Sequence, residues 1–131
     1  PLDELLNYLE IYNIKWGIVT NKPCRMTLKL LHKLNLDCPY VISGDPLGAR
    51  KPNPKPLYIA CELMNIKSED AIYVGDACRD IKAGNDANMT TITANYGYIK
   101  HEDDTNAWGA DFNATSPSHL SNLVKNLLGE F

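Results

Sequence analysis

The chain has 131 residues, the length of one domain, and its 44% hydrophobic and 22% charged residues are ordinary for a globular protein. Its formal net charge of -3, without a basic patch, argues against nucleic acid as a partner. No apolar run approaches the ~20 residues that cross a bilayer, and no secretory signal is visible, so we expect a cytoplasmic protein. The four cysteines form no C-x-x-C pair and are expected to be reduced thiols.

Helical and extended patterns alternate along the chain. Apolar residues at helical spacing predict helices over 2–9, after Asn21 (apolar face Leu28, Leu31 and Leu34), over 53–65, over 77–87 and from Ser116-Pro117 to 128. Short apolar or β-branched runs predict strands at 16–20, 40–42, 71–74 and 90–93, and a last short one around Phe112. This alternation is typical of an α/β fold with a parallel sheet, which we place in one domain over 1–131.

Three asparagines mark expected helix boundaries. Asn21 is expected to cap the helix after strand 16–20, and Asn53 the next helix, with Pro54 at its first helical position. Asn88 suits a left-handed stop of helix 77–87.

Two carboxylates follow strand 71–74. Asp76 stands where the strand ends, and Asp80 lies one helical turn further on the same face. Like charges at this spacing repel each other, and a divalent cation would reverse that cost. Magnesium is commonly held by one or two carboxylates with water and phosphate, so the pair predicts a Mg²⁺ site. The alternative is that Asp76 only caps the helix and Asp80 is a solvated surface residue.

Two further groups are expected near this pair. Thr20 and Asn21 end strand 16–20, where a hydroxyl, an amide and free backbone N–H groups suit a phosphate, or simply cap a helix. Lys51 lies in a Gly/Pro-rich loop, where a fixed ammonium can neutralise a phosphate and an aspartate together, or is merely solvated. Since ligands bind outside the carboxyl ends of parallel strands, we expect all these groups at one edge of the sheet.

The segments 18–23, 44–57 and 73–80 resemble the second, third and fourth motifs of the haloacid dehalogenase superfamily, in the right order and at suitable spacing. Within that superfamily the chain is similar to the phosphoglycolate phosphatase group. The segment from Tyr96-Gly97-Tyr98-Ile99 through Asp103-Asp104 to Trp108-Gly109-Ala110-Asp111 resembles bacterial N-acetylmuramic acid 6-phosphate phosphatases.

The resemblance implies roles for the residues already singled out. Thr20 would bond the transferring phosphoryl group with Asn21 beside it, and Lys51 would stabilise the phosphoryl charge and the nucleophile. Asp76 would bind Mg²⁺, and Asp80 would support the metal site directly, through water or through the lysine. Members of the superfamily form an aspartyl-phosphate, which water hydrolyses, and a second aspartate two residues after the nucleophile acts as acid and base.

The first motif of the superfamily, Asp-x-Asp, is absent from these 131 residues, because Asp103 and Asp104 are adjacent and lie in the wrong place. The nucleophile is therefore expected upstream of Pro1, with the helical cap that shapes substrate choice. The resemblance also places the missing first strand between strands 16–20 and 71–74. We expect their facing edges to be unpaired and open to a missing N-terminal segment or another copy, and the chain alone to be inactive.

Three functional hypotheses follow. The leading one is a phosphomonoester hydrolase acting on a small phosphorylated metabolite or sugar phosphate. The second is a non-catalytic fragment or remnant that binds phosphate or a partner protein. The third is a receiver-like signalling domain. Such a domain would have its acidic pair at the end of an early strand and its lysine near the last strands, whereas here Lys51 precedes Asp76.

Overall fold

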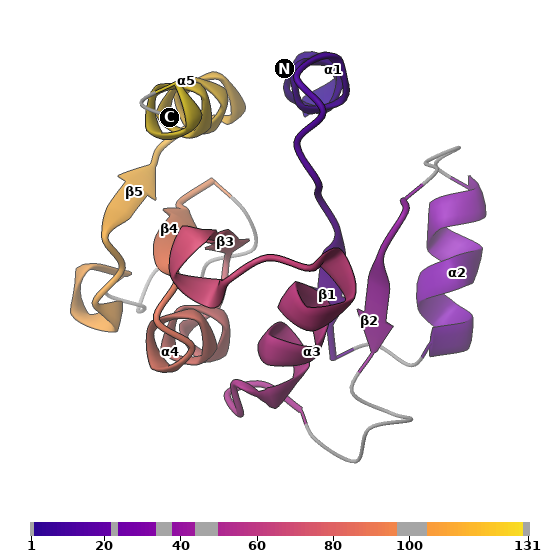
Figure 1. Cartoon of the computed structure of the whole chain (residues 1–131). Helices are drawn as coiled ribbons and strands as arrows, with labels where there is room; N and C mark the ends of the chain where they lie inside the picture. Colours follow the sequence, from indigo (N-terminus) through magenta and orange to yellow (C-terminus); the bar gives the residue numbers. More distant parts are fainter. Residues whose placement is uncertain (1, 22–23, 34–37, 44–49, 97–104, 130–131) are drawn as a thin grey trace.

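The computed structural model describes residues 2–21, 24–33, 38–43, 50–96 and 105–129 (Figure 1). Within them the helices are α1 (Leu2–Ile11), α2 (Cys24–Lys33), α3 (Lys55–Met64), α4 (Cys78–Asp86) and α5 (Pro117–Leu128), with short 3-10 turns η1 (Ser68–Asp70) and η2 (Thr105–Trp108). The strands are β1 (Ile18–Thr20), β2 (Val41–Ser43), β3 (Ile72–Gly75), β4 (Thr90–Ala94) and β5 (Phe112–Ala114). None of the described helices is long and apolar enough to cross a bilayer.

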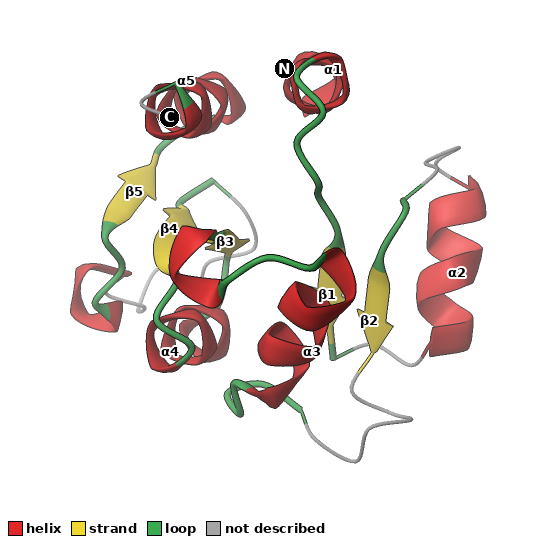
Figure 2. Ribbon diagram, viewed as in Figure 1, coloured by secondary structure: helices red, strands yellow, loops and turns green. Residues whose placement is uncertain are grey.

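The strands form two parallel sheets, one of order β1-β2 and one of order β3-β4-β5 (Figure 2). In the first sheet Ile18 pairs with Val41, and in the second Val74 pairs with Ile92. The predicted α/β fold with parallel strands is therefore confirmed. The strand ends that follow Thr20 and Gly75 are both carboxyl ends, where the site residues were expected.

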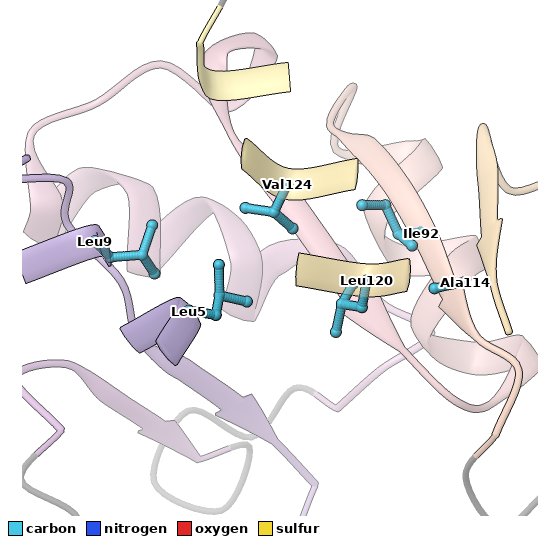
Figure 3. Packing of buried hydrophobic residues seen from close by; sticks show 6 residues of the cluster. All are labelled: Leu5, Leu9, Ile92, Ala114, Leu120 and Val124. Atoms are coloured by element: carbon cyan, nitrogen blue, oxygen red, sulfur yellow. The ribbon is translucent and has the colours of Figure 1, made fainter. Parts of the chain in front are cut away.

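Helices cover both faces of the second sheet. On one face α1 and α5 pack together over Ile92 and Ala114, and the buried residues of this core are Leu5, Leu9, Ile92, Ala114, Leu120 and Val124 (Figure 3). On the other face lies α4, which contacts β3 and β4 and joins α3, the helix beside β1 and β2, in a second core. The buried residues of this core are Leu57, Cys61, Ala83, Ala87 and Met89. Successive side chains of a strand point to opposite faces, so Val74 joins the first core and Tyr73 the second.

A gap separates the two sheets. β1 and β3 line opposite sides of a cavity of about 560 Å³, whose other walls include Leu5 and Leu9 of α1 and Leu57 of α3. The Ile18 N–H bonds the Tyr40 carbonyl beside β2 at 2.9 Å. Because backbone groups alternate along a strand, Val19 turns its N–H and C=O toward the cavity instead. Among the described residues no strand pairs with β1 or β3 on the side where they face each other, as expected, although the Val19 carbonyl accepts bonds from Lys51 and Tyr73.

Most expected helix boundaries are confirmed. Asn88 has φ 62°, as a left-handed stop requires, and the Ser116 side chain accepts the His119 N–H at the start of α5. The cap of α3 is Pro54, one residue later than expected, although the Asn53 side chain still accepts the Lys55 N–H at 2.9 Å.

One expectation for α2 is wrong and another stays a prediction. The side chain of Asn21 binds the backbone of Lys51, and its expected cap of α2 involves residues 22–23, which lie outside the described residues. Leu31 is buried, but Leu28 is 54% exposed, so the apolar face is narrower than its spacing suggested. Leu34 lies outside the described residues.

We predict that Ile92→Ala lowers the free energy of unfolding by about 2–5 kcal/mol, because Ile92 is fully buried and its truncation leaves a cavity. Urea unfolding followed by circular dichroism measures this loss. Ile11→Ala is the matched control, since Ile11 is 77% exposed and such substitutions stay within about 0.5 kcal/mol. Equal losses in the two variants would contradict the assignment of Ile92 to the core.

Candidate functional site

The ammonium of Lys51 is the centre of the site. It lies 2.6 Å from the Asp80 Oδ1 atom, 2.7 Å from the Tyr73 hydroxyl and 3.0 Å from the Val19 carbonyl oxygen. An ammonium has three donors, and these three acceptors match them in number. The Lys51 and Asp80 side chains are only 7% and 8% exposed, so the alternative of a solvated loop lysine is wrong.

The charge pair is costly to break. Two buried charges are stable together only when their hydrogen bonds are satisfied. Removing one partner leaves the other charge buried without a counter-charge in a poorly solvating interior. The second oxygen of Asp80 is also engaged, because Oδ2 accepts the Ala77 N–H at 3.2 Å. Asp80 is therefore not the solvated surface residue that the sequence left as an alternative.

Gly75 makes room for the Asp80 carboxylate. A Cβ atom at position 75 would lie 2.3 Å from the Asp80 Cβ and 2.8 Å from its Oδ2, far inside van der Waals contact. The turn from β3 into α4 can bring Asp80 this close to the strand only with glycine at that place. In the Gly75-Asp76 dipeptide, the glycine leaves space for the Asp80 side chain and the next residue supplies a second carboxylate.

Asn21 fixes the backbone of Lys51. Its side-chain Oδ1 accepts the Lys51 N–H at 3.0 Å, and its Nδ2 donates to the Lys51 carbonyl at 3.1 Å. Arg50 adds a bond from its Nη2 to the Asn21 carbonyl at 3.2 Å. The residue after β1 is thereby joined to the loop before α3, although 30 positions separate Asn21 from Lys51 in the sequence.

Asp76 differs from Asp80 in its surroundings. Its side chain is exposed, and within the described residues no hydrogen bond or ion pair engages it. It follows β3, whereas Thr20 ends β1 and pairs in register with Ser43. The described residues contain no group of three or more His, Cys, Asp or Glu side chains that could hold a metal ion. Asp76 alone fits a magnesium ion that takes its remaining ligands from water and phosphate.

Tyr73 is the residue of the site that sequence reasoning missed. The sequence reads it as one member of an apolar strand, but its hydroxyl donates to the Val19 carbonyl at 3.1 Å and accepts from Lys51. Burial, and secondarily the Asp80 carboxylate, raise the pKa of Tyr73 above its ordinary value, so the hydroxyl stays protonated. The available signal was a polar tip within a buried strand, which must find a partner.

Fold and site together define a parallel α/β protein with a buried ammonium at the carboxyl edge of its sheets. The family model described as haloacid dehalogenase-like hydrolase matches residues 2–94. The chain belongs to this family, as the three motifs predicted.

Relatives with named activities match nearly all of the chain. It is 39% identical over 127 residues to N-acetylmuramic acid 6-phosphate phosphatase of Pseudomonas putida, covering 95% of this chain and 57% of that protein. It is 42% identical over 123 residues to phosphoglycolate phosphatase of Xylella fastidiosa, covering 92% and 53%. The crystal structure of a HAD phosphatase from Thermococcus onnurineus matches with a TM-score of 0.76 at 26% identity, covering 96% and 55%. The chain therefore spans a little over half the length of these relatives.

We predict that Asp80→Ala lowers the free energy of unfolding by about 3–5 kcal/mol, because it leaves the Lys51 ammonium buried without its counter-charge. Denaturant unfolding at neutral pH measures the loss. Asp86→Ala, an exposed carboxylate in the same helix, is the control and is expected to change stability by less than about 0.5 kcal/mol. A change as small as the control's in Asp80→Ala would show that the pair is solvated.

Proposed function

We propose that the protein carrying this chain is a Mg²⁺-dependent phosphomonoester hydrolase, and that residues 1–131 are the C-terminal part of its single core domain. The observation that supports this most directly is the buried Lys51 ammonium, held by Asp80 at the carboxyl edge of the sheets. A fixed positive charge in a poorly solvated place favours the negative charge of a transferring phosphoryl group. The names of the two relatives, both phosphatases of small phosphorylated compounds, point the same way.

The residues of this chain divide the work of binding the phosphoryl group. Thr20 donates a hydrogen bond from its hydroxyl to a phosphoryl oxygen, and the Lys51 ammonium balances part of the negative charge of the phosphoryl group. Asn21 contributes by holding the Lys51 backbone through both of its amide atoms. Asp76 binds Mg²⁺ through its exposed carboxylate, and Asp80 supports the metal site through its ion pair with Lys51. When bound, the metal ion supplies positive charge that balances the phosphate oxygens.

The covalent steps need two aspartates that these 131 residues do not provide. We propose that they stand in an Asp-x-Asp segment upstream of Pro1. One carboxylate oxygen would attack phosphorus while the ester oxygen leaves with a proton from the other carboxyl group. Water would then attack the aspartyl-phosphate, giving up a proton to that carboxylate and releasing phosphate. Splitting one displacement into two in this way is the general advantage of covalent catalysis.

The cavity between β1 and β3 is where we place this segment. In the described part of the chain no strand lies between β1 and β3, the lining is mostly apolar, and Lys51 binds the Val19 carbonyl on the β1 edge. A strand there would join the two sheets into one and bring its carboxyl end beside the Lys51 ammonium. A second copy of the chain, or another partner protein, is the alternative occupant, and would fit a binding function without catalysis.

We expect the full-length protein to release phosphate from small phosphomonoesters only when Mg²⁺ is present. Asp76→Asn should lower kcat/KM by at least about a hundredfold, since the metal supplies several kcal/mol of charge stabilisation, with little change in unfolding free energy. Colorimetric phosphate release measures the Mg²⁺ dependence and the loss in kcat/KM, and denaturant unfolding measures the change in stability. Asp86→Asn should keep full activity. Full activity in Asp76→Asn would refute its role at the metal, and no phosphate release by the wild type would refute the hydrolase proposal.

We also expect the 131-residue chain by itself to be inactive, to bind the apolar dye ANS and to self-associate as its concentration rises, because unpaired strand edges favour pairing with other chains. Sedimentation and dye fluorescence test this against the full-length protein, which should show neither property. A monomeric, dye-free 131-residue chain would show that its edges are closed in another way.

A further inference from the structure

The Tyr73 hydroxyl lies at the junction of the two sheets and touches the centre of the site. It is 2.7 Å from the Lys51 ammonium and 3.1 Å from the Val19 carbonyl oxygen, while that oxygen is 3.0 Å from the same ammonium. The three polar atoms therefore form a closed triangle. Two corners come from side chains of β3 and of the segment before α3, and the third from the backbone of β1.

The direction of each bond in this triangle follows from the chemistry of its atoms. A carbonyl oxygen only accepts and an ammonium only donates, so the single hydroxyl proton must point to Val19. The hydroxyl lone pair is then left to accept from Lys51. One arrangement of protons satisfies all three atoms, and it sets the direction of one N–H of the ammonium.

The ring of Tyr73 is held rigidly enough to serve as a reference. It packs against the core formed by Leu57 and Ala83, and its Cδ2 atom lies 3.3 Å from the place where a Cβ on Gly84 would stand. Lysine, in contrast, reaches the site on a flexible stem of four carbons. Without the Tyr73 hydroxyl the ammonium keeps two anchors, Asp80 Oδ1 and the Val19 carbonyl oxygen, and its third N–H has no acceptor among the described contacts.

We propose that Tyr73 is a positioning residue, whose hydroxyl holds the Lys51 ammonium at the place from which its positive charge acts on the phosphoryl group. This inference rests on the proposed function and adds to it. Tyr73 itself touches neither substrate nor metal; it acts through Lys51. Phenylalanine at this position would fill the same space, so the hydroxyl is the only group whose removal tests the role.

The test compares Tyr73→Phe with Tyr58→Phe in the full-length protein. Tyr58 is a matched control, because its hydroxyl also donates to a backbone carbonyl, that of Asp86 at 3.1 Å, on an exposed part of α3. With ¹⁵N-labelled lysine, NMR at low temperature should show the Lys51 ammonium as a signal protected from exchange with water. In Tyr73→Phe these ammonium protons should exchange with water at least about tenfold faster, because the variant lacks one hydrogen bond to a charged group. Tyr58→Phe should leave them unchanged.

Phosphatase kinetics supply a second readout. Tyr73→Phe should lower kcat about tenfold with little change in KM, because a misoriented ammonium loses stabilisation mainly in the transition state. An unchanged Lys51 signal in Tyr73→Phe would overturn the inference, as would unchanged kcat or an unfolded variant, which would mark the hydroxyl as structural. A wild-type protein without activity would overturn the proposed function instead, and the NMR comparison would still decide whether Tyr73 holds Lys51.

Discussion

A buried ammonium must find an acceptor for each of its protons, and much of the site follows from that requirement at Lys51. Its three acceptors come from three separate parts of the chain: Val19, Tyr73 and Asp80. The donor and its acceptors must each be held in place. Gly75 leaves space for Asp80 beside β3, and the Asn21 side chain holds the backbone of Lys51. The bonds to Lys51 thus link β1 of the first sheet with β3 and α4, which lie across the gap.

The gap between the sheets and the site are parts of one arrangement. The cavity runs along β1 and β3, and Lys51 and Tyr73 both bind the Val19 carbonyl on the β1 edge. The proposed strand would join the two sheets and end beside the ammonium. The chain spans 57% and 53% of the length of the two named relatives.

The two aspartates after β3 differ in burial and in their hydrogen-bond partners. Asp80 is buried, with one oxygen on Lys51 and the other on the Ala77 N–H, so its charge is already balanced within the protein. Asp76 is exposed and keeps its oxygens available, as a ligand to a hydrated cation must. The pair that its spacing predicted to share one environment therefore consists of one exposed carboxylate and one buried carboxylate that binds the lysine.

Periodicity and motif spacing are local properties, and they were enough to predict the alternation of helices and strands, the parallel sheet and the family. Long-range contacts in the folded chain were needed to show that Asn21 holds the backbone of Lys51 and that Tyr73 binds its ammonium. Both facts depend on bonds between residues 30 and 22 positions apart, which local pattern cannot register. Packing decides which polar groups are buried, and burial forces them to pair.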